Sequence, residues 1–439
     1  MKLNDMVIIS VDDHISEPPH LFSNHLSGPA LASAPQFKTK SNGTNYWDYQ
    51  GLKMSSVALN GVIGRPKEEY GMEPTALSQL RKGCWDAAAR VGDMDVNGVA
   101  ASLNFGTLIG LDGLMFCTAP DKTHAVQHVQ AYNDYHWEEW CRAFPGRFIM
   151  NGIIPAWDMN ATVAEVNRLA KLGCTSISFN ENPTKRGLPS VHNAYWEPLW
   201  KVCADTDMTI NLHIGAGNPS PHASDESPIE AWITTMPMSV SVGLADWLHL
   251  AALQRYPGLK IAMSESGIGW IPYLLERADY AHMQHHAWTH SDTYLKGLKP
   301  SEVFKKHFYS CFIDDAYGCR NLDLVGEDHV CYEVDYPHSD APWPDAPEVL
   351  WRSVGKLSDA LIDKVTHLNA MKLYRFDLFD MIPKNQLTVA ALRAKAKAAG
   401  VDTTVKSSGG AAPLAAGAKP RAVTSGDVAA MFRNHAEAV

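Results

Sequence analysis

The sequence lacks the features that mark nucleic-acid-binding, membrane-spanning and disulfide-bonded proteins. Its 48 acidic residues outnumber 38 basic ones, and the net charge of -10 offers no basic surface to a nucleic acid or an anionic membrane. The eight cysteines never form a CxxC pair, which excludes a zinc knuckle and a thioredoxin-type motif and favours reduced, mostly buried thiols. No apolar run is long enough for a signal peptide or a membrane span. We therefore expect a cytoplasmic protein that acts on a small molecule.

Several nucleotide-binding and catalytic motifs are absent as well. GAGNPS (215–220) and GIGWIP (267–272) lack the third glycine of a dinucleotide fingerprint, and no GxxxxGK[ST] loop occurs. There is no GxSxG elbow for a serine nucleophile. The histidines at 282, 285, 286 and 290 have helical spacing, but HAWTH lacks the glutamate of HExxH. We interpret them as a solvated or interfacial helix face, with a contact to the active site as the alternative.

The chain does contain a regular alternation of short apolar runs with helical patterns. Segment 160–173 is typical, because apolar residues recur at helical spacing from Val163 until Gly173 ends the pattern. Eight runs predict strands, at 6–11, 99–105, 148–154, 175–179, 209–214, 260–265, 307–312 and 330–335. Strands that alternate with helices pair in parallel, and eight such units close into an α/β fold, the (β/α)8 TIM barrel. An open doubly wound sheet is the alternative.

Two regions fall outside this repeat. Residues 23–85 contain short β-like pieces punctuated by Gly and Asn, so we expect a small β-rich flap inserted after the first strand. We assign residues 1–385 to the barrel and 386–439 to a flexible linker and a C-terminal tail helix. The tail has a possible cap at Ser425 and an apolar trio at Val428, Met431 and Phe432, suited to docking on the body or on a partner subunit, with a frayed tail as the alternative.

Polar residues stand at the ends of five predicted strands. These are Asp12, Asp13 and His14 after the first, Asn180 and Glu181 after the fourth, His213 after the fifth, Glu265 after the sixth and Asp335 after the eighth. In a (β/α)8 barrel the carboxyl ends of the strands converge over the axis, where catalysis takes place.

These strand-end residues have the chemistry of a cation site. Asp12 and His14 are two apart, so their side chains share one face of an extended segment, while Asp13 reads as a turn residue. A single His213 would more often be a hydrogen-bonded core histidine. Several carboxylates buried together without a counter-charge would cost many kcal/mol, and a divalent cation is the usual remedy.

The chain resembles amidohydrolase-related proteins, the "amidohydrolase 2" group of metal-dependent TIM-barrel enzymes, over residues 6 to about 380. The motifs that carry the resemblance are VDDHISEPPHLF, PSVHNAYWEPLW, NLHIGAG, SESGIGWIPYLLERAD and EVDYPHSDAPWPD. The resemblance implies that Asp12 and His14 are the strand-one metal pair, His213 the strand-five ligand and Asp335 the strand-eight carboxylate. This chain departs from many relatives in having Asp12-x-His14 instead of HxH, Glu265 in place of a histidine, and no lysine after strand four.

The departures raise the question of a second ion. Glu17, in the pattern DxHxxE, together with Glu265 and His192 could accommodate one, and a carboxylate-rich site suits Mn, Fe or Zn. Capping or a salt bridge is the alternative role for Glu17 and Glu265. We therefore expect one or two divalent ions, and the resemblance extends to dinuclear proteins of this group, some of which are oxygenases.

The leading functional hypothesis is hydrolysis of a small amide, ester or related acyl compound by a metal-activated water. Asp335, His338 and Glu265 are the candidate catalytic residues, with Asp335 moving a proton and His338 stabilising the developing oxyanion. The alternatives are nonoxidative decarboxylation of an aromatic acid and a dinuclear Fe or Mn oxygenase. We also expect a homo-oligomer, because of the tail helix and the aromatic-rich helices.

Overall fold

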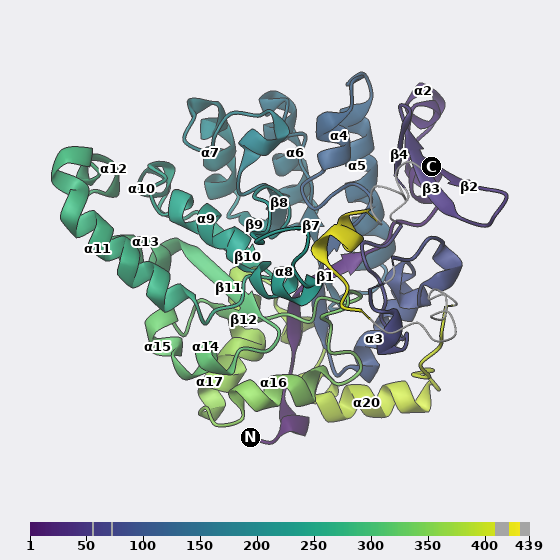
Figure 1. The fold of residues 1–439 in the computed structure, drawn as a ribbon. Coiled ribbons are helices and arrows are strands. Elements are labelled where there is room, and N and C mark those ends of the chain that lie inside the picture. Colours follow the sequence, from purple (N-terminus) through teal and green to yellow (C-terminus); the bar gives the residue numbers. More distant parts are fainter. Residues whose placement is uncertain (55–56, 72, 409–420, 431–439) are drawn as a thin grey trace.

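The computed structural model describes residues 1–439 except 55–56, 72, 409–420 and 431–439. Its main element is a parallel sheet of nine short strands in the order β6-β5-β1-β12-β11-β10-β9-β8-β7 (Figure 1). These strands are β1 (Ile9–Ile15), β5 (Ala101–Gly106), β6 (Phe148–Ile149), β7 (Asn151–Gly152), β8 (Ser176–Phe179), β9 (Thr209–His213), β10 (Lys260–Ser264), β11 (Phe308–Phe312) and β12 (Val330–Tyr332).

The two ends of this sheet are halves of one strand. Only Met150 separates β6 from β7; β6 pairs with β5, and β7 pairs with β8. At the opposite seam, β1 pairs with β12, so the first and last barrel strands are neighbours. The sheet therefore closes on itself with eight strand positions, and the predicted (β/α)8 barrel is confirmed.

Helices surround the strands and connect them. The longer ones are α3 (Ala87–Val96), α5 (Ala125–Tyr135), α6 (Met159–Lys171), α7 (Glu197–Asp205), α9 (Met238–Trp247), α11 (Ile271–Thr289), α13 (Pro300–His307) and α16 (Ala346–Val354). Shorter ones are α1 (Leu21–His25), α2 (Gly28–Ala32), α4 (Leu114–Thr118), α10 (Ala252–Arg255), α12 (Asp292–Leu295), α14 (Ala316–Arg320), α15 (Leu322–Val325), α17 (Asp359–Asp363), α18 (Asn369–Leu373) and α19 (Leu378–Met381).

Helix α6 illustrates how the sequence specifies these elements. The Asp158 side chain caps its first turn by accepting a hydrogen bond from Ala161 N at 3.0 Å. Val166 and Leu169 are fully buried on the face towards the sheet. Gly173 follows the helix with φ +90°, a conformation that favours glycine. The predicted helix over this segment is thus present, starting one residue earlier than Asn160.

The first strand differs from the prediction in a way that matters for the site. The apolar run predicted a strand at 6–11, whereas β1 spans Ile9–Ile15 and contains Asp12, Asp13 and His14. Its register with β5 shifts between Ser10 and Asp13. The strand continues through these residues because the main chains of Asp12 and His14 pair with the segment after β12, and the Asp13 side chain accepts from Tyr336 N there, which the local sequence does not reveal.

The expected flap is present within residues 23–85. β2 (Gln36–Thr39), β3 (Asn45–Tyr49) and β4 (Leu52–Met54) form a separate antiparallel sheet. Trp47 packs its ring edge against Phe22 and Phe37, and Tyr49 donates or accepts a hydrogen bond with His128 at 3.1 Å. Buried aromatic side chains therefore attach the flap to the barrel.

The linker prediction is wrong for residues 389–398. They form helix α20 (Val389–Ala398), whose Val389 N donates to Met6 O at 2.9 Å, while Arg393 Nε donates to Val96 O at 3.2 Å. Val389 and Leu392 are buried, so α20 belongs to the barrel body. An Ala- and Lys-rich decapeptide has high helix propensity, but its composition is close to that of a soluble linker.

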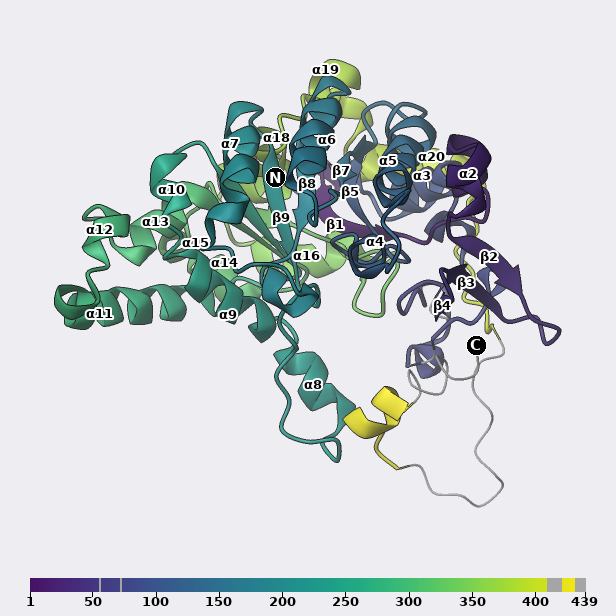
Figure 2. The ribbon, with the colours of Figure 1, turned by 90° about the horizontal axis from the view of Figure 1, so that it is seen from above.

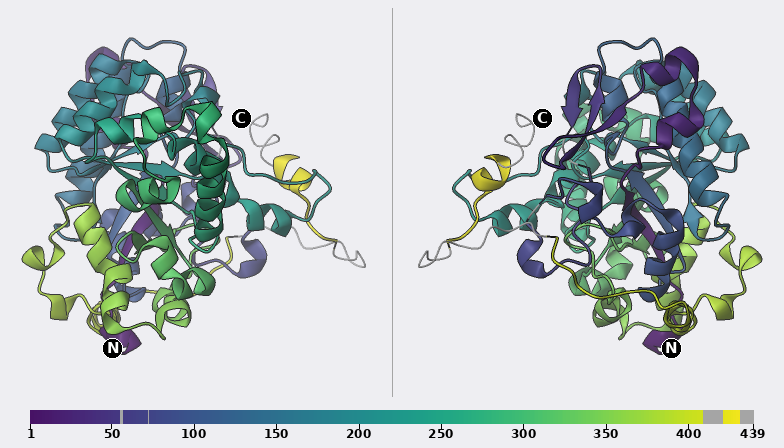
Figure 3. Two further views of the ribbon diagram at one scale, coloured as in Figure 1. Left: turned by 90° about the vertical axis from the view of Figure 1, so that its left-hand side faces the viewer. Right: turned by 90° about the vertical axis from the view of Figure 1, so that its right-hand side faces the viewer.

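The predicted tail helix is present at residues 425–430, while Met431 and Phe432 lie outside the described residues. The cap is Thr424, whose Oγ1 accepts from Asp427 N at 3.2 Å while Asp427 Oδ2 accepts from Thr424 N at 2.9 Å, and not Ser425 as predicted. This segment docks on its own chain beside α8 (Ile229–Thr235), where Ile229 N donates to Val423 O at 2.9 Å. Both project from the barrel (Figures 2 and 3).

Among the described residues, we find no helix with both the length and the apolar character needed to cross a membrane.

Candidate metal centre

Six of the polar residues converge where four barrel strands end at the carboxyl side. Asp12 and His14 lie in β1, His213 is the last residue of β9, and Glu265 directly follows β10. Asp335 and His338 follow β12. The β1–β12 seam continues past the end of β12, because Asp335 N donates to Asp12 O at 2.8 Å and His14 N to Tyr336 O at 2.6 Å.

The imidazole Nε2 of His14 is at the centre of this group. It lies 3.4 Å from Asp12 Oδ1, 3.4 Å from Glu265 Oε1 and 3.3 Å from Asp335 Oδ1. His213 Nε2 is 3.3 Å from His14 Nε2 and 3.4 Å from Asp12 Oδ2. Two overlapping sets of possible donors result: Asp12, His14, His213 and Glu265; and His14, Glu265, Asp335 and His338.

These distances suit donors that share a cation. Atoms bound to one ion at about 2.0–2.2 Å lie about 3 to 3.5 Å from one another. Both carboxylate oxygens of Asp12 are buried without a hydrogen-bond partner. His213 Nδ1 faces the carbonyl oxygen of Ile214 at 2.6 Å, which leaves Nε2 as the ligand atom if Nδ1 carries the proton. The residues fit a divalent cation.

The electrostatics of the group point the same way. Burial raises the pKa of Asp12 above its usual value. Burial, together with the charge of Glu265, also raises the pKa of Asp335 well above its usual value. Burial opposes protonation of His213, but Asp12 and Glu265 raise the pKa of its imidazole well above normal. A divalent cation would supply the missing positive charge and favour the ionised carboxylates.

Two members of the group have unusual backbone conformations. Glu265 has φ 52° and Asp335 has φ 61°, both in the left-handed region that non-glycine residues seldom occupy. Such conformations cost of order 1 kcal/mol or more, and they persist where the surroundings impose them, often at functional sites. Both residues stand just beyond a strand, where the chain turns over the barrel mouth.

His338 and Glu265 form the more open side of the group. Their side chains are 11% and 15% exposed, whereas Asp12 and His14 are fully buried. His338 Nδ1 contacts Asp335 Oδ1 at 2.7 Å. An imidazole in contact with a buried carboxyl group at the open side can pass a proton between the site and the solvent.

Sequence reasoning missed the role of Arg90, which lies in α3. Its side chain is fully buried and donates to Gly83 O at 2.7 Å, to Asn104 Oδ1 at 2.9 Å and to the carbonyl oxygen of His14. The guanidinium also stacks on the ring of Tyr336, 4.1 Å from its centroid. Arg90 therefore fixes the backbone of a candidate ligand. The two residues are 76 positions apart, and no local sequence signal connects them.

The sequence predicted that Asp13 is a turn residue, and this prediction is wrong, because Asp13 lies within β1. Its Oδ1 accepts from Ser10 Oγ at 2.9 Å and from Tyr336 N at 3.1 Å, and Arg90 lies 4.0 Å from its other oxygen. Burial raises the pKa of Asp13 to about 7. This carboxylate joins β1 to the segment after β12, and so helps to align Asp12 with Asp335.

Glu333 is a further buried acid that the sequence analysis overlooked. Its Oε2 accepts from Glu265 N at 3.0 Å and from the Cys311 thiol at 2.6 Å. The available signal was a second acid at the end of the predicted eighth strand, two residues before Asp335. Glu333 orients the backbone of Glu265 from beneath the donor group.

Glu17 lies elsewhere. Its carboxylate accepts hydrogen bonds from Thr107 N at 2.9 Å and Leu108 N at 2.8 Å, just past β5. It belongs to neither set of donors. Glu17 thus caps a turn, which is the alternative role that the sequence left open, because it follows the end of β1 at Ile15 and its carboxylate accepts from the amides after β5.

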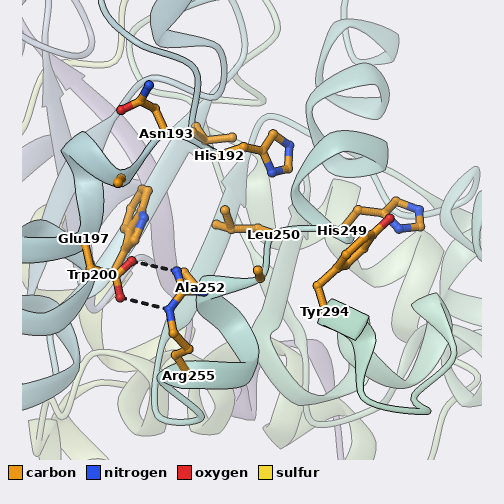
Figure 4. A pocket seen from close by; sticks show the side chains of 12 residues that line it. His192, Asn193, Glu197, Trp200, His249, Leu250, Ala252, Arg255 and Tyr294 are labelled. Carbon is orange, nitrogen blue, oxygen red and sulfur yellow. Dashed lines mark hydrogen bonds and ion pairs between the residues drawn. The ribbon is translucent and has the colours of Figure 1, made fainter. Parts of the chain in front are cut away.

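His192 also lies outside the group. Its Nε2 contacts Asp246 Oδ1 at 2.9 Å, and it lines a surface cavity of about 440 Å³ between α7 and the segment around α10 (Figure 4). In this cavity Arg255 forms two hydrogen bonds with Glu197, at 2.9 and 2.6 Å. None of the six residues of the candidate metal centre lines it. The predicted set of second-ion ligands is therefore not assembled by this structure.

Comparison with known families gives one match that covers most of the chain. A family model described as amidohydrolase matches residues 47–376. The matched range includes His213, Glu265 and Asp335, and it begins after Asp12 and His14.

Solved structures share the fold at low sequence identity. An amidohydrolase from Mycobacterium avium subsp. paratuberculosis has a TM-score of 0.65 and 17% identity, covering 84% of this chain and 99% of its own. 5-Carboxyvanillate decarboxylase from Sphingomonas paucimobilis has a TM-score of 0.58 and 17% identity, and the match covers 84% of this chain and 99% of that protein. A Polaromonas dihydroxybenzoic acid decarboxylase with bound manganese and the inhibitor 2-nitroresorcinol has a TM-score of 0.57 and 18% identity. This match covers 86% of this chain and 98% of that protein.

Proposed function

The chain belongs to the amidohydrolase family, and we propose that it catalyses metal-dependent, nonoxidative decarboxylation of a small aromatic acid. The observation that carries this proposal is the donor group around His14 Nε2, with the Asp335–His338 pair at its open side. The aromatic acid decarboxylases among the proteins of similar fold support the choice of reaction.

We propose that Asp12, His14, His213 and Asp335 hold one divalent ion, with Glu265 as a further donor. Carboxylate and imidazole donors without thiolates suit manganese, zinc or iron, and the high share of carboxylates favours manganese. When bound, the ion supplies positive charge that attracts a substrate carboxylate and an adjacent phenolic oxygen.

The remaining chemistry is proton transfer by this chain's own residues. When the bond between the ring and the carboxyl group breaks, carbon dioxide leaves and the bonding electrons remain on the ring carbon. That carbon needs one proton, which the Asp335–His338 pair at the open side of the group would supply. His338, 2.7 Å away and partly exposed, would return a proton from solvent to Asp335.

A second candidate is hydrolysis of a small amide or ester. If Asp12, Glu265 and Asp335 are all ionised, three negative charges face one divalent cation, and this balance favours a neutral substrate over an anionic acid. The Asp335–His338 pair would then accept a proton from water and return it to the leaving group.

The experiment uses protein purified without a metal-affinity tag, analysed for metal and then loaded separately with manganese, zinc or iron. Release of carbon dioxide from hydroxybenzoates supports decarboxylation, whereas turnover of esters or amides alone selects hydrolysis. Two ions per chain with oxygen consumption would select an oxygenase. If the protein bound none of these metals, all three reactions would be refuted.

Two variants test the residue roles. His338→Gln should retain the metal and lose most turnover, because it removes a proton carrier at the open side of the group. His192→Gln is the matched control, a histidine substitution outside the group, and should leave metal content and turnover unchanged. Equal losses in both variants would contradict the assigned role of His338.

A further inference from the structure

Helix α11 exposes an unusual amount of apolar side chain. Tyr273, Tyr280, Met283 and Trp288 are 74%, 53%, 60% and 70% exposed. In this 19-residue helix only Ile271 and Leu275 are buried. Single exposed apolar residues are common on protein surfaces, but four on one helix form a patch that calls for a partner.

The four exposed residues share one side of the helix. At about 100° per residue, positions 273, 280, 283 and 288 fall within an arc of about 140°, opposite Ile271 and Leu275. We call these four residues the α11 outer face. The helix lies at the edge of the molecule (Figures 1 and 2), and the exposed fractions of the four side chains indicate that the described elements leave this face open.

The outer face has a nearly palindromic order. The midpoint of Ile271–Thr289 is residue 280, and a two-fold axis just past Tyr280 would pair each position with one on an antiparallel copy. Tyr273 would then face Trp288, and Glu276 would face the exposed His285. Tyr280 would lie near the axis, next to its own copy. Aromatic residues would meet aromatic residues, and an acid would meet an imidazole.

We propose that the α11 outer face is a two-fold interface through which two copies of this chain associate with their α11 helices antiparallel. Antiparallel helices of about 28 Å also align their dipoles favourably. Within one copy Asp292 already contacts His282 and His286, at 3.4 and 2.7 Å, so Glu276 of the other copy would face the remaining histidine, His285.

The area of the face reaches the lower limit for a specific dimer. With about 200 Å² per large side chain, the four exposed fractions leave about 500 Å² of apolar surface on each copy. A symmetric pair would bury about 1,000 Å² from these side chains alone, which is the lower limit for a specific interface. Exposed Val242 on α9, a helix that adjoins α11, could extend it.

The first test measures oligomeric state by light scattering after gel filtration at micromolar concentration. The full chain should be a dimer, and Tyr280→Glu and Trp288→Glu should each raise its dissociation constant by roughly 100-fold or more. Val405→Glu is the matched control, since Val405 is 59% exposed and lies outside α11. Circular dichroism and metal content verify that the variants fold.

The second test checks orientation by disulfide formation between copies. A mixture of Tyr273→Cys and Trp288→Cys chains should form a cross-linked pair under mild oxidation, whereas Tyr273→Cys alone should not. A monomeric wild-type chain would overturn the proposal, as would a dimer that both glutamate variants leave intact. Cross-linking of Tyr273→Cys to itself would overturn the antiparallel arrangement.

Discussion

Replacing Glu17 with glutamine should change how stability depends on pH without changing metal content. Glu17 is buried, and its carboxylate accepts two backbone hydrogen bonds from Thr107 and Leu108. Burial raises its pKa from the usual 4.5 to about 7, although these hydrogen bonds oppose the shift. The native state therefore binds a proton that the unfolded chain has already released at pH values between these limits.

The sign and size follow from proton linkage. Because the native pKa is raised, this group costs least stability below about pH 4.5, and the cost grows as pH rises through about 7. A shift of about 2.5 units corresponds to about 3 kcal/mol in all, of which about 2.5 kcal/mol falls between pH 5 and 8. Glutamine does not ionise, but it can accept only one of the two backbone hydrogen bonds, which costs about 1–3 kcal/mol at every pH.

Glu17→Gln should therefore be less stable than wild type near pH 5, and should draw level or become more stable near pH 8. Urea denaturation across this range, with metal content measured in parallel, checks both statements. A difference in stability that does not vary with pH would refute the burial argument. Loss of one metal equivalent would refute the placement of Glu17 away from the metal centre and restore the two-ion hypothesis.

Three further outcomes are expected. Chelation of the metal should lower the unfolding temperature, and restored manganese should reverse this, with about 4 kcal/mol gained at a thousandfold excess over the dissociation constant; no shift would mean that no ion contributes to stability. Asp12→Asn should reduce metal content at least about tenfold, measured by elemental analysis, because both Asp12 oxygens lie 3.4 Å from an imidazole nitrogen. Arg90→Lys should destabilise by about 3 kcal/mol in urea, because a lysine cannot make the three hydrogen bonds of the buried guanidinium. The exposed Arg142→Lys is its control, and equal small effects would contradict the anchoring role.

The barrel could be predicted because its signals are local. Each strand is a short apolar run, and each of the polar residues from Asp12 to Asp335 stands at or near the end of such a run. Since the carboxyl ends of barrel strands meet at one mouth, order along the chain was enough to bring His213 and Glu265 together with Asp12. The barrel fold alone therefore predicted that these three side chains lie close together.

The parts that could not be predicted depend on contacts far along the chain. The direction of Glu17 depends on where β1 ends and on the amide groups that follow β5, about 90 residues later. Arg90 reaches the His14 carbonyl only because α3 packs beside β1. The helix α20 was missed because an Ala- and Lys-rich segment becomes ordered through packing on α3, which composition does not report.

The β1–β12 seam gives the metal centre a second consequence. Asp12 and His14 belong to the first strand of the barrel, and Asp335 follows the last one, so an ion held by them would act as a removable cross-link between distant parts of the chain. Unlike a disulfide, which also constrains the unfolded chain, such a cross-link exists only in the folded protein, and it forms and dissolves with metal supply. Closure of the barrel and loading of its reactive centre would then be one event.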